Sequence, residues 1–366
     1  MAVKTKDNIT LKDIAKKLGV AASTVSNAYN RPDQLSEALR TKILETAKEL
    51  GYCGPDPMAA NLRRGKAGAI GVVYPHPLSY TFTDPVAAPT IQGIAEEAER
   101  AGYGLLLVGG SEDPLEAAPL VAKATVDGFV LQNFDKNDSL LEVILSRNLP
   151  VVFVESQTRE GFPSITVDDE GGARVAANHL LSLGHKRFGI IALETTHHVR
   201  EGIMDKARQA GVVHVPTRNR LRGYRRAVDA TKLKWDKNVV VYETADNTLG
   251  DGYRAAAALL THPLRPTALL AMSDQLALGT LRYANDNKIN VPKQLSVVGF
   301  DDAPLASQTT PALTTVRQPY VEKGRLAGQL LIAQLKENTV PESVVLPTEL
   351  IVRGSSGKAN SGKPAK

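Results

Sequence analysis

The sequence predicts two folds in one chain: an N-terminal all-α helix-turn-helix domain, followed by an α/β body of two lobes. Residues 1–66 hold twelve Lys or Arg and seven Asp or Glu, a net charge of +5, whereas the rest of the chain has no net charge. The first 52 residues space their apolar side chains at helical intervals. From Ala69 onward, continuous apolar runs alternate with helical stretches, which is typical of parallel sheets covered on both faces.

Composition limits the classes of protein. With 366 residues, 43% hydrophobic and 23% charged, the chain is globular and long enough for two or three domains. It has no apolar run that could span a membrane and no secretory signal at its start, so we expect a cytoplasmic protein. The single cysteine, Cys53, cannot form an intramolecular disulfide or a cysteine-based zinc site. We expect no cofactor and no metal.

The first 52 residues contain three helix signals. Thr10 and Asp13 form a capping-box-like start, and Gly19 ends that helix. A second helix is expected over 22–29, and Ser36 caps a third that Gly51 ends. Helix, tight turn and helix predict a DNA-binding motif whose second helix enters the major groove. An ordinary three-helix bundle with a solvated basic surface is the alternative.

Several motifs of this segment resemble the headpiece of the lactose/galactose repressor (LacI/GalR) family: 10–20, 23–30, 35–36 and 50–52. The resemblance extends over about 8–353. The family often has Ser where Ala21 stands and usually Arg where Asn27 stands, so the common contact to guanine is absent here. Asn pairs best with adenine. The DNA contacts that we expect are Thr10, Ala22, Ser23, Thr24, Ser26, Asn27, Asn30, Leu62 and Arg63.

The linker over 53–66 reads CGPDPMAANLRRGK, and Pro55 and Pro57 fit the first turn of a short helix. Such a helix is too short to be stable alone. The resemblance implies a hinge helix that orders on DNA and inserts Leu62 into the minor groove as a wedge. The alternative is that Leu62 is a linker residue packed against the core. Asp56 departs from the family's Asn and is unfavourable near phosphates unless it caps the hinge helix.

The body is expected to form two sheets separated by helices. The candidate strands span 69–74, 104–109, 128–132, 151–155, 164–167, 188–193, 239–242, 268–272 and 295–300. The candidate helices span 91–101, 114–124, 138–147, 171–183, 221–231, 250–260 and 275–287. Because ligands bind beyond the carboxyl ends of such strands, two lobes predict a site in the cleft between them.

This body resembles the type I periplasmic-binding-protein-like core of the same family, through motifs at 127–131, 184–187, 220–224, 273–274, 297–302 and 313–319. By that resemblance the chain crosses between lobes near Thr166, Thr314 and Val340. The domains are then 1–52 (helix-turn-helix), 53–66 (hinge) and 67–353 (effector binding and dimerisation). The N-lobe would comprise 67–165 and 317–339, and the C-lobe 166–314 and 344–353. The tail, 354–366, is rich in Ser, Gly and Lys and is expected to be disordered.

Six residues match the family's effector contacts: Tyr74, Glu155, Asp168, Arg220, Ser273 and Asp301. The Arg220 guanidinium suits a carboxylate, a phosphate or a vicinal diol. The acids accept hydroxyl or amine groups, although each could instead be a helix cap or a surface pair. Phe82 is a candidate to stack on a sugar face. The segment 195–219, longer than is usual in the family, is expected to form a surface loop or extra helix over the cleft rather than a metal site.

We therefore expect a transcriptional regulator, most simply a homodimeric repressor that binds pseudo-palindromic operator DNA under the control of a small-molecule effector. A sugar or related metabolite is the expected effector, and a nucleoside or other non-sugar ligand is the alternative. A solute-binding protein would need an export signal, and an enzyme would need a nucleophile–base pair or a phosphate loop, which the sequence does not display. The sequence leaves open whether the effector is an inducer or a corepressor.

Overall fold

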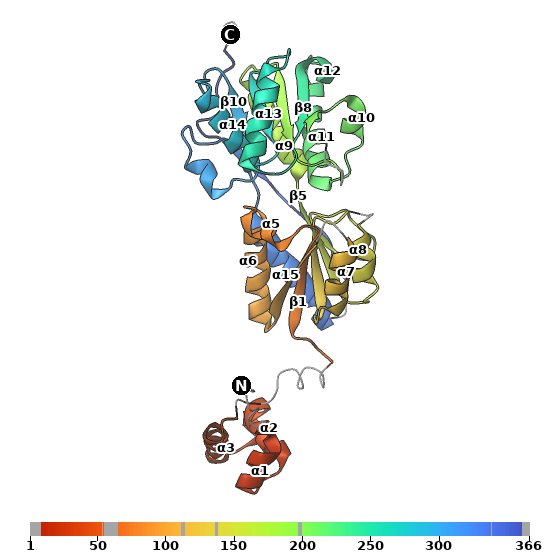
Figure 1. Cartoon of the computed structure of the whole chain (residues 1–366), viewed down its shortest axis with the longest axis vertical. Coiled ribbons are helices and arrows are strands. Elements are labelled where there is room, and N and C mark those ends of the chain that lie inside the picture. Colours follow the sequence, from red (N-terminus) through yellow and green to blue (C-terminus); the bar gives the residue numbers. More distant parts are fainter. Residues whose placement is uncertain are drawn as a thin grey trace, which may run out of the picture. The chain divides into compact units, whose positions relative to one another are not determined.

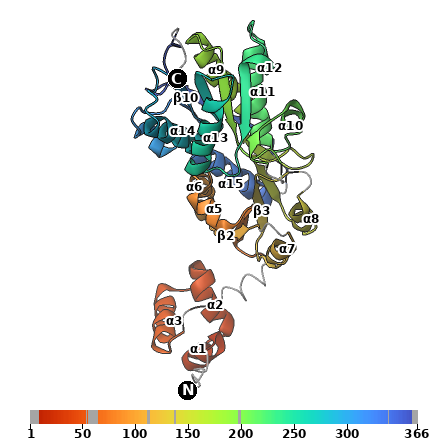
Figure 2. The same cartoon turned by 45° about the horizontal axis from the view of Figure 1, so that its top comes forward.

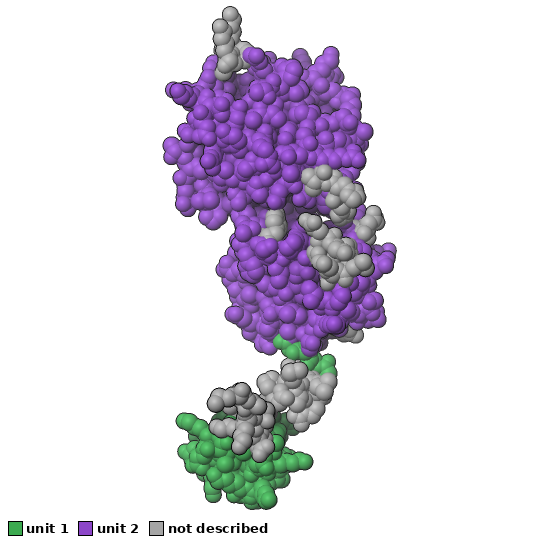
Figure 3. Space-filling model, in the orientation of Figure 1, with its two compact units in different colours: residues 1–68 green, residues 69–366 purple. Residues whose placement is uncertain are grey.

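A computed structural model describes residues 9–52, 54, 65–110, 114–135, 138–196, 200–337 and 339–360. The chain forms two compact units, the head (residues 1–68) and the body (residues 69–366), coloured separately in Figure 3. Each unit has a hydrophobic core of its own.

The described residues of the head form three helices and one short 3₁₀ turn: α1 (Leu11–Leu18), α2 (Ala22–Asn30), η1 (Pro32–Gln34) and α3 (Glu37–Glu49). These confirm the three predicted helices. The backbone N–H and the hydroxyl of Thr10 both donate to Asp13 Oδ2, at 2.8 and 2.7 Å. Gly19 takes the left-handed conformation at the end of α1 (φ 68°), which allows the tight turn into α2. Ile14, Val25 and Ile43 form the centre of the core.

The body's first sheet is parallel, with strand order β12-β5-β4-β3-β1-β2. Its strands are β1 (Ala69–Tyr74), β2 (Gly104–Gly109), β3 (Gly128–Gln132), β4 (Val151–Val154), β5 (Ser164–Val167) and β12 (Val344–Leu346). Its helices are α5 (Leu78–Thr83), α6 (Ala87–Ala101), α7 (Pro114–Lys123), α8 (Ser139–Leu145) and α15 (Tyr320–Glu337). Helices α6 and α15 cover one face and α7 and α8 the other, so the inner strands are buried on both sides (Figure 1).

The second sheet has the order β10-β9-β6-β8-β7, in which only the edge strand β7 is antiparallel among the described strands. Its strands are β6 (Phe188–Ala192), β7 (Gly202–Ile203), β8 (Val239–Glu243), β9 (Ala268–Ala271) and β10 (Ser296–Val298). Its helices are α9 (Asp169–Ser182), α10 (Lys206–Ala210), α11 (Val215–Asp229), α12 (Trp235–Asn238), α13 (Leu249–Thr261) and α14 (Asp274–Asp286), with a 3₁₀ turn η2 (Pro304–Ser307). Figure 2 gives a second view of these helices around the sheet.

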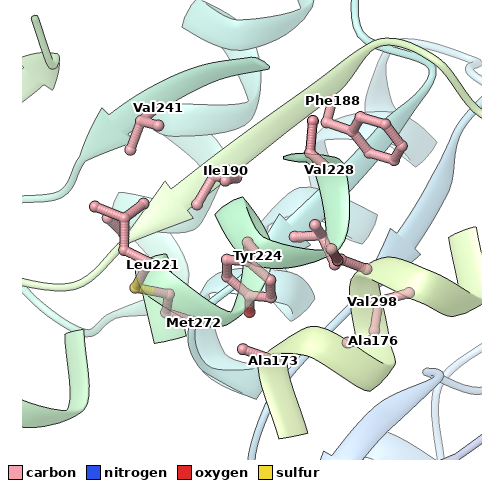
Figure 4. Close-up of a cluster of buried hydrophobic side chains, with 14 of the residues drawn as sticks. Ala173, Ala176, Phe188, Ile190, Leu221, Tyr224, Val228, Val241, Met272 and Val298 are labelled. Atoms are coloured by element: carbon pink, nitrogen blue, oxygen red, sulfur yellow. The ribbon is translucent and has the colours of Figure 1, made fainter. Parts of the chain in front are cut away.

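One face of the second sheet packs on α9 and α11. Figure 4 shows Tyr224 and Val228 of α11 beside Ile190 of β6 and Ala173 of α9. The opposite face packs on α13 and α14. Each lobe is therefore a three-layer α/β unit, which confirms the predicted fold class.

Strand pairing corrects the expected lobe boundaries. Strand β12 pairs in parallel with β5, so Val344–Leu346 belongs to the first sheet and not to the second lobe. The first crossing follows Val167 rather than Ile165, because β5 continues in the first sheet to that residue. The remaining two crossing segments are β11 (Thr315–Arg317) and β13 (Glu349–Ile351), which pair with each other antiparallel.

The segment 355–360, expected to be disordered, packs on the second lobe instead. Ser355 is fully buried, its hydroxyl donating to Val297 O at 2.6 Å and accepting from Thr314 N–H at 2.8 Å. Ala359 N–H donates to Leu183 O at 2.8 Å. Small polar residues suffice here because the hydrogen bonds use the backbone and the hydroxyls of Ser355 and Ser356. Residues 361–366 lie outside the described part of the tail.

Helices α6 and α15 cross at glycines. A Cβ built on Gly324 of α15 would lie 1.9 Å from Thr90 O, and one on Gly93 of α6 would lie 2.0 Å from Val321 O. The two backbones are therefore in direct contact, and neither position has room for a side chain.

Across the described residues, no helix combines the length and apolar composition that crossing a membrane requires.

Candidate functional site

The first turn of α2 carries the residues expected to contact DNA. Ser23 is exposed, whereas Thr24 and Ser26 are half-buried and Ala22 packs partly against the head core. Asn30 Nδ2 donates to Ser26 O at 3.1 Å and Ser26 Oγ at 3.2 Å, so these two predicted residues are linked to each other. Thr10 is exposed at the N-terminus of α1. Leu62 and Arg63, the expected hinge contacts, lie outside the described residues.

Asn27 has a partner that the sequence analysis did not identify. Its Nδ2 donates to Gln34 Oε1 at 3.1 Å, and Gln34 ends the 3₁₀ turn η1. The Asn27 amide nitrogen carries two N–H groups, and the Gln34 bond uses one of them, so the second can donate to a base. The Gln34 contact holds the Asn27 amide in one orientation.

The main cavity of the body lies between the two lobes, at the carboxyl ends of both sheets, and has a volume of about 510 Å³. Its lining includes five of the six residues predicted to contact an effector: Tyr74, Glu155, Arg220, Ser273 and Asp301. Tyr74 OH donates to Gln132 Oε1 at 2.6 Å, which fixes the ring at the end of β1. The topology predicted from alternating strands and helices therefore brings these distant residues together.

Asp168 is the exception, because it does not line the cavity. Its side chain is exposed, and Oδ1 accepts the Gly171 N–H at 2.8 Å as the N-cap of α9. The next residue, Asp169, is the one buried against Arg220. Phe82 is also misplaced: it is 67% exposed and does not line the cavity.

Arg220 is buried at the end of the cavity in the second lobe. Its Nε donates to Asp169 Oδ1 at 2.7 Å, its Nη1 donates to Met272 O, and its guanidinium lies 3.8 Å from the centroid of the Phe300 ring. Burial acts to lower the pKa of Arg220, but Asp169 and Asp301 outweigh it and hold the pKa above its usual value. Arg220 is therefore a fixed, charged group that uses two of its five N–H donors in these two hydrogen bonds.

Asp301 follows β10 with an unusual backbone conformation, φ 128°. Its Oδ1 accepts from Gln318 Nε2 at 2.7 Å and lies 3.8 Å from Arg220 Nη1. Burial raises the pKa of Asp301 despite the nearby Arg220 cation. A strained backbone held by several contacts is typical of a site whose geometry matters for function.

The first lobe supplies a second buried ion pair, and Lys323 is a residue that the sequence analysis missed. Lys323 Nζ donates to Glu155 Oε1 at 2.8 Å, and the Lys323 side chain is 1% exposed. Helical spacing could have found it, because Lys323, Ala327 and Leu331 fall at i, i+4 and i+8 on the buried face of α15. Glu155 sits at φ 50°, and its Oε2 is buried without a hydrogen-bond partner among the described residues.

The polar contacts between the lobes at the cavity include His214 with Asp135 and Asn247 with Asp84. His214 Nδ1 lies 2.8 Å from Asp135 Oδ2, and Asn247 Nδ2 donates to Asp84 Oδ2 at 3.5 Å. Burial acts to lower the pKa of His214, but the hydrogen bond and charge of Asp135 outweigh it and raise that pKa. His214 belongs to the long segment 195–219, which forms β7, α10 and the start of α11 and contributes to the cavity wall. His197 and His198 lie outside the described residues.

Comparison with known proteins matches both units. Residues 10–54 match the family described as bacterial regulatory proteins, lacI family, and residues 177–356 match the family described as periplasmic binding protein-like domain. The chain is 40% identical to the HTH-type transcriptional regulator Rv3575c of Mycobacterium tuberculosis, over 97% of this chain and 98% of that protein. The chain belongs to the LacI family.

Other LacI-family proteins match along nearly the whole chain. The HTH-type transcriptional repressor CytR of Escherichia coli is 33% identical, over 97% of this chain and 98% of that protein. A LacI-family regulator from Corynebacterium glutamicum has a solved structure with TM-score 0.72 and 32% identity, covering 97% of this chain and 100% of its own. A CelR–cellobiose complex superposes with TM-score 0.68 and 28% identity, over 95% and 100% of the two chains.

Membership of the LacI family gives each unit its general role. The head is the DNA-binding part and the body is the ligand-binding part of a transcriptional regulator. The named relatives are regulators and not enzymes.

Proposed function

We propose that this protein is a homodimeric repressor whose affinity for operator DNA is set by a small molecule held between the two lobes. The observation that carries the proposal is the cavity of about 510 Å³, which is lined from both lobes and contains buried, oriented polar groups. Its volume falls in the range of small-molecule sites, about 300–1,000 Å³. A relative named as a repressor and a structural neighbour described as a cellobiose complex support the two halves of the proposal.

In this proposal, the head and the hinge recognise the operator DNA. In this proposal α2 enters the major groove, with Ser23 and Ser26 near phosphates and Asn27 on an adenine edge. Thr10, Ala22, Thr24, Asn30 and Arg63 complete the protein surface against the duplex. Leu62 from each subunit inserts into the minor groove at the operator centre and bends the duplex.

Control by ligand requires that the ligand bind two arrangements of the lobes with different affinity. The residues at 65–68 connect the first lobe to the hinge, so a change of lobe angle in a dimer changes the spacing of the two hinge segments. A short helix has little stability of its own, and a coupling free energy of about 1–3 kcal/mol changes operator affinity by about 5–150-fold. A ligand that favours the ordered hinge is a corepressor, and a ligand that disfavours it is an inducer.

The test begins with the full-length protein and a pool of random duplexes, from which retained fragments are sequenced. A pseudo-palindromic consensus is the expected result.

Operator affinity is then measured with and without candidate effectors in wild type and in Leu62→Ala. Wild type should respond to the effector, and Leu62→Ala should bind the operator more weakly and respond less, with unchanged effector affinity. Equal coupling in both proteins would remove Leu62 from the mechanism, and a monomer on DNA would contradict the dimer.

A further inference from the structure

Beside the segments that cross between the lobes, buried polar side chains form one continuous series of contacts from the first lobe to the second. The nitrogen–oxygen distances between neighbouring side chains of this series, in order from the first lobe, are 2.8 Å, 3.4 Å, 2.7 Å, 3.8 Å and 2.7 Å. The series runs Glu155, Lys323, Gln318, Asp301, Arg220, Asp169. Anions and cations alternate along it, with one neutral amide between the two lobes.

Both cations of this series are already neutralised by carboxylates of the protein. Lys323 is 1% exposed and bound to Glu155, and Arg220 is 5% exposed and bound to Asp169. If either cation left its carboxylate for an anionic ligand, that buried carboxylate would lose its partner. Such a loss is strongly destabilising because the remaining charge is neither solvated nor paired.

The other charged groups that line the cavity are mostly acids: Asp84, Asp135, Glu194 and Asp246. His214 also lines the cavity, where it is paired with Asp135. Burial lowers the pKa of His76, so this histidine is neutral near pH 7. Among the described residues that line the cavity, acidic side chains therefore outnumber the cationic side chains that could attract an anionic ligand.

We propose that the effector is a neutral or positively charged molecule rich in O–H or N–H donors, and that the Glu155–Lys323 pair excludes phosphates and carboxylates from the cleft. Glu155 is the specificity-determining residue. Its Oε1 holds Lys323, and its buried Oε2, which has no partner among the described residues, accepts a donor of the effector. This inference rests on the proposal that the cleft holds the effector.

Removal of the Glu155 charge should convert the cleft into an anion site. In Glu155→Gln the Lys323 ammonium has no carboxylate partner, so inorganic phosphate should bind the full-length variant about tenfold or more tighter than wild type, the factor that one charge-assisted hydrogen bond supplies. Binding is measured by calorimetry and by the phosphate-dependent rise in Tm, with chloride at matched ionic strength. Glu349→Gln is the matched control, because Glu349 is exposed on β13.

A second variant keeps this test decisive. Glu155→Gln/Lys323→Met removes the exposed ammonium again and should lose the gained phosphate affinity. Phosphate binding by wild type that Lys323→Met abolishes would overturn the proposal. A folded Glu155→Gln variant with no gain in phosphate affinity would also overturn it, because Glu155 would then not be what excludes anions.

Matched ligands test the same point in wild type. Among glucose, glucosamine and glucose 6-phosphate, and between ribose and ribose 5-phosphate, any binding should favour the neutral or amine member. Tighter binding of a phosphorylated member would contradict the proposal, and if no member binds, the phosphate experiment decides. Neither readout involves DNA, so failure here is distinguishable from a failure of operator control.

Discussion

In the proposed effector site, Arg220 would both contact the ligand and support the fold, since it is buried between Asp169 and Asp301. Arg220→Ala should weaken effector binding by about 1–3 kcal/mol. It should also destabilise the body by about 3–5 kcal/mol, because two buried carboxylates lose their cation. Calorimetry measures the first effect and urea unfolding the second. Asp301→Asn, nearly isosteric, should weaken binding with less loss of stability, and wild-type effector affinity in both variants would remove these residues from the site.

Asn27 determines one base of the proposed operator half-site. Because Asn pairs best with adenine, an A·T pair is expected there, and Asn27→Arg should shift the preference to G·C by about 1–3 kcal/mol. Selection from a randomised operator measures the shift. Gln34→Ala serves as a comparison, since it leaves Asn27 in place but removes the Oε1 that orients its amide. An unchanged base preference in Asn27→Arg would contradict the contact.

Sequence reasoning found most of the cavity because strand ends in an α/β lobe converge on one edge. Tyr74, Glu155 and Asp301 each follow or end a strand, and all three line the cavity. Asp168 was misassigned because two acids are adjacent at the start of α9, and only the backbone direction decides which one caps the helix. Lys323 was missed because a lysine on a helix is ordinarily solvated, and its partner lies 168 positions away.

At the scale of elements, the crossing of α6 and α15 depends on the absence of a side chain at Gly324. Gly324→Ala places a methyl group 1.9 Å from Thr90 O, so the helices must separate. We expect a loss of about 1–3 kcal/mol in the free energy of unfolding. Gly250→Ala is the matched control, because a Cβ there meets nothing closer than 3.6 Å. An equal effect of both substitutions would show that helix contact is not the cause.

The long strands of the body are confirmed almost to the residue, since continuous runs such as Ala69–Tyr74 and Gly128–Gln132 are buried on both faces. Four short strands that were not predicted, β7, β11, β12 and β13, have two or three residues each and carry no periodic signal. Their pairing is determined by segments distant in the chain, so the lobe boundaries near Val344 could not be located from local pattern. The same reason explains the tail, where Ser355 binds residues more than forty positions away.

For the whole molecule, the His214–Asp135 contact should make stability depend on pH. The pKa of His214 is raised in the folded protein, mainly by Asp135 against the opposing effect of burial. Its stabilising contribution is complete below the unfolded pKa, about 6.5, and is lost as pH rises through the higher folded pKa. His214→Gln should therefore lower Tm more at pH 6 than at pH 8.5. Asp135→Asn should have the same pH dependence, and an equal loss at both pH values would contradict the ion pair.

DNA binding by the whole molecule should depend on the head and on salt. With a net charge of +5 over 1–66, the head should bind phosphates with log affinity that falls linearly with log salt concentration. Deletion of 1–68 should abolish operator binding and leave a folded body that still binds effector. Gel shift and calorimetry check the two halves. Operator affinity retained by the truncated body would show that the head is not the DNA-binding unit.

The return of the chain to the first lobe through β12 has a consequence during synthesis. The third described helix of the head ends at Glu49, whereas the first sheet lacks its edge strand until Leu346 and the second lobe lacks its closing segment until Asn360. At about 5–20 residues per second, roughly 15–60 s separate these points. A nascent chain thus carries a finished three-helix head well before its sensor is complete. A premature stop codon before position 344 would yield that head joined to a sensor that lacks β12 and its closing segment.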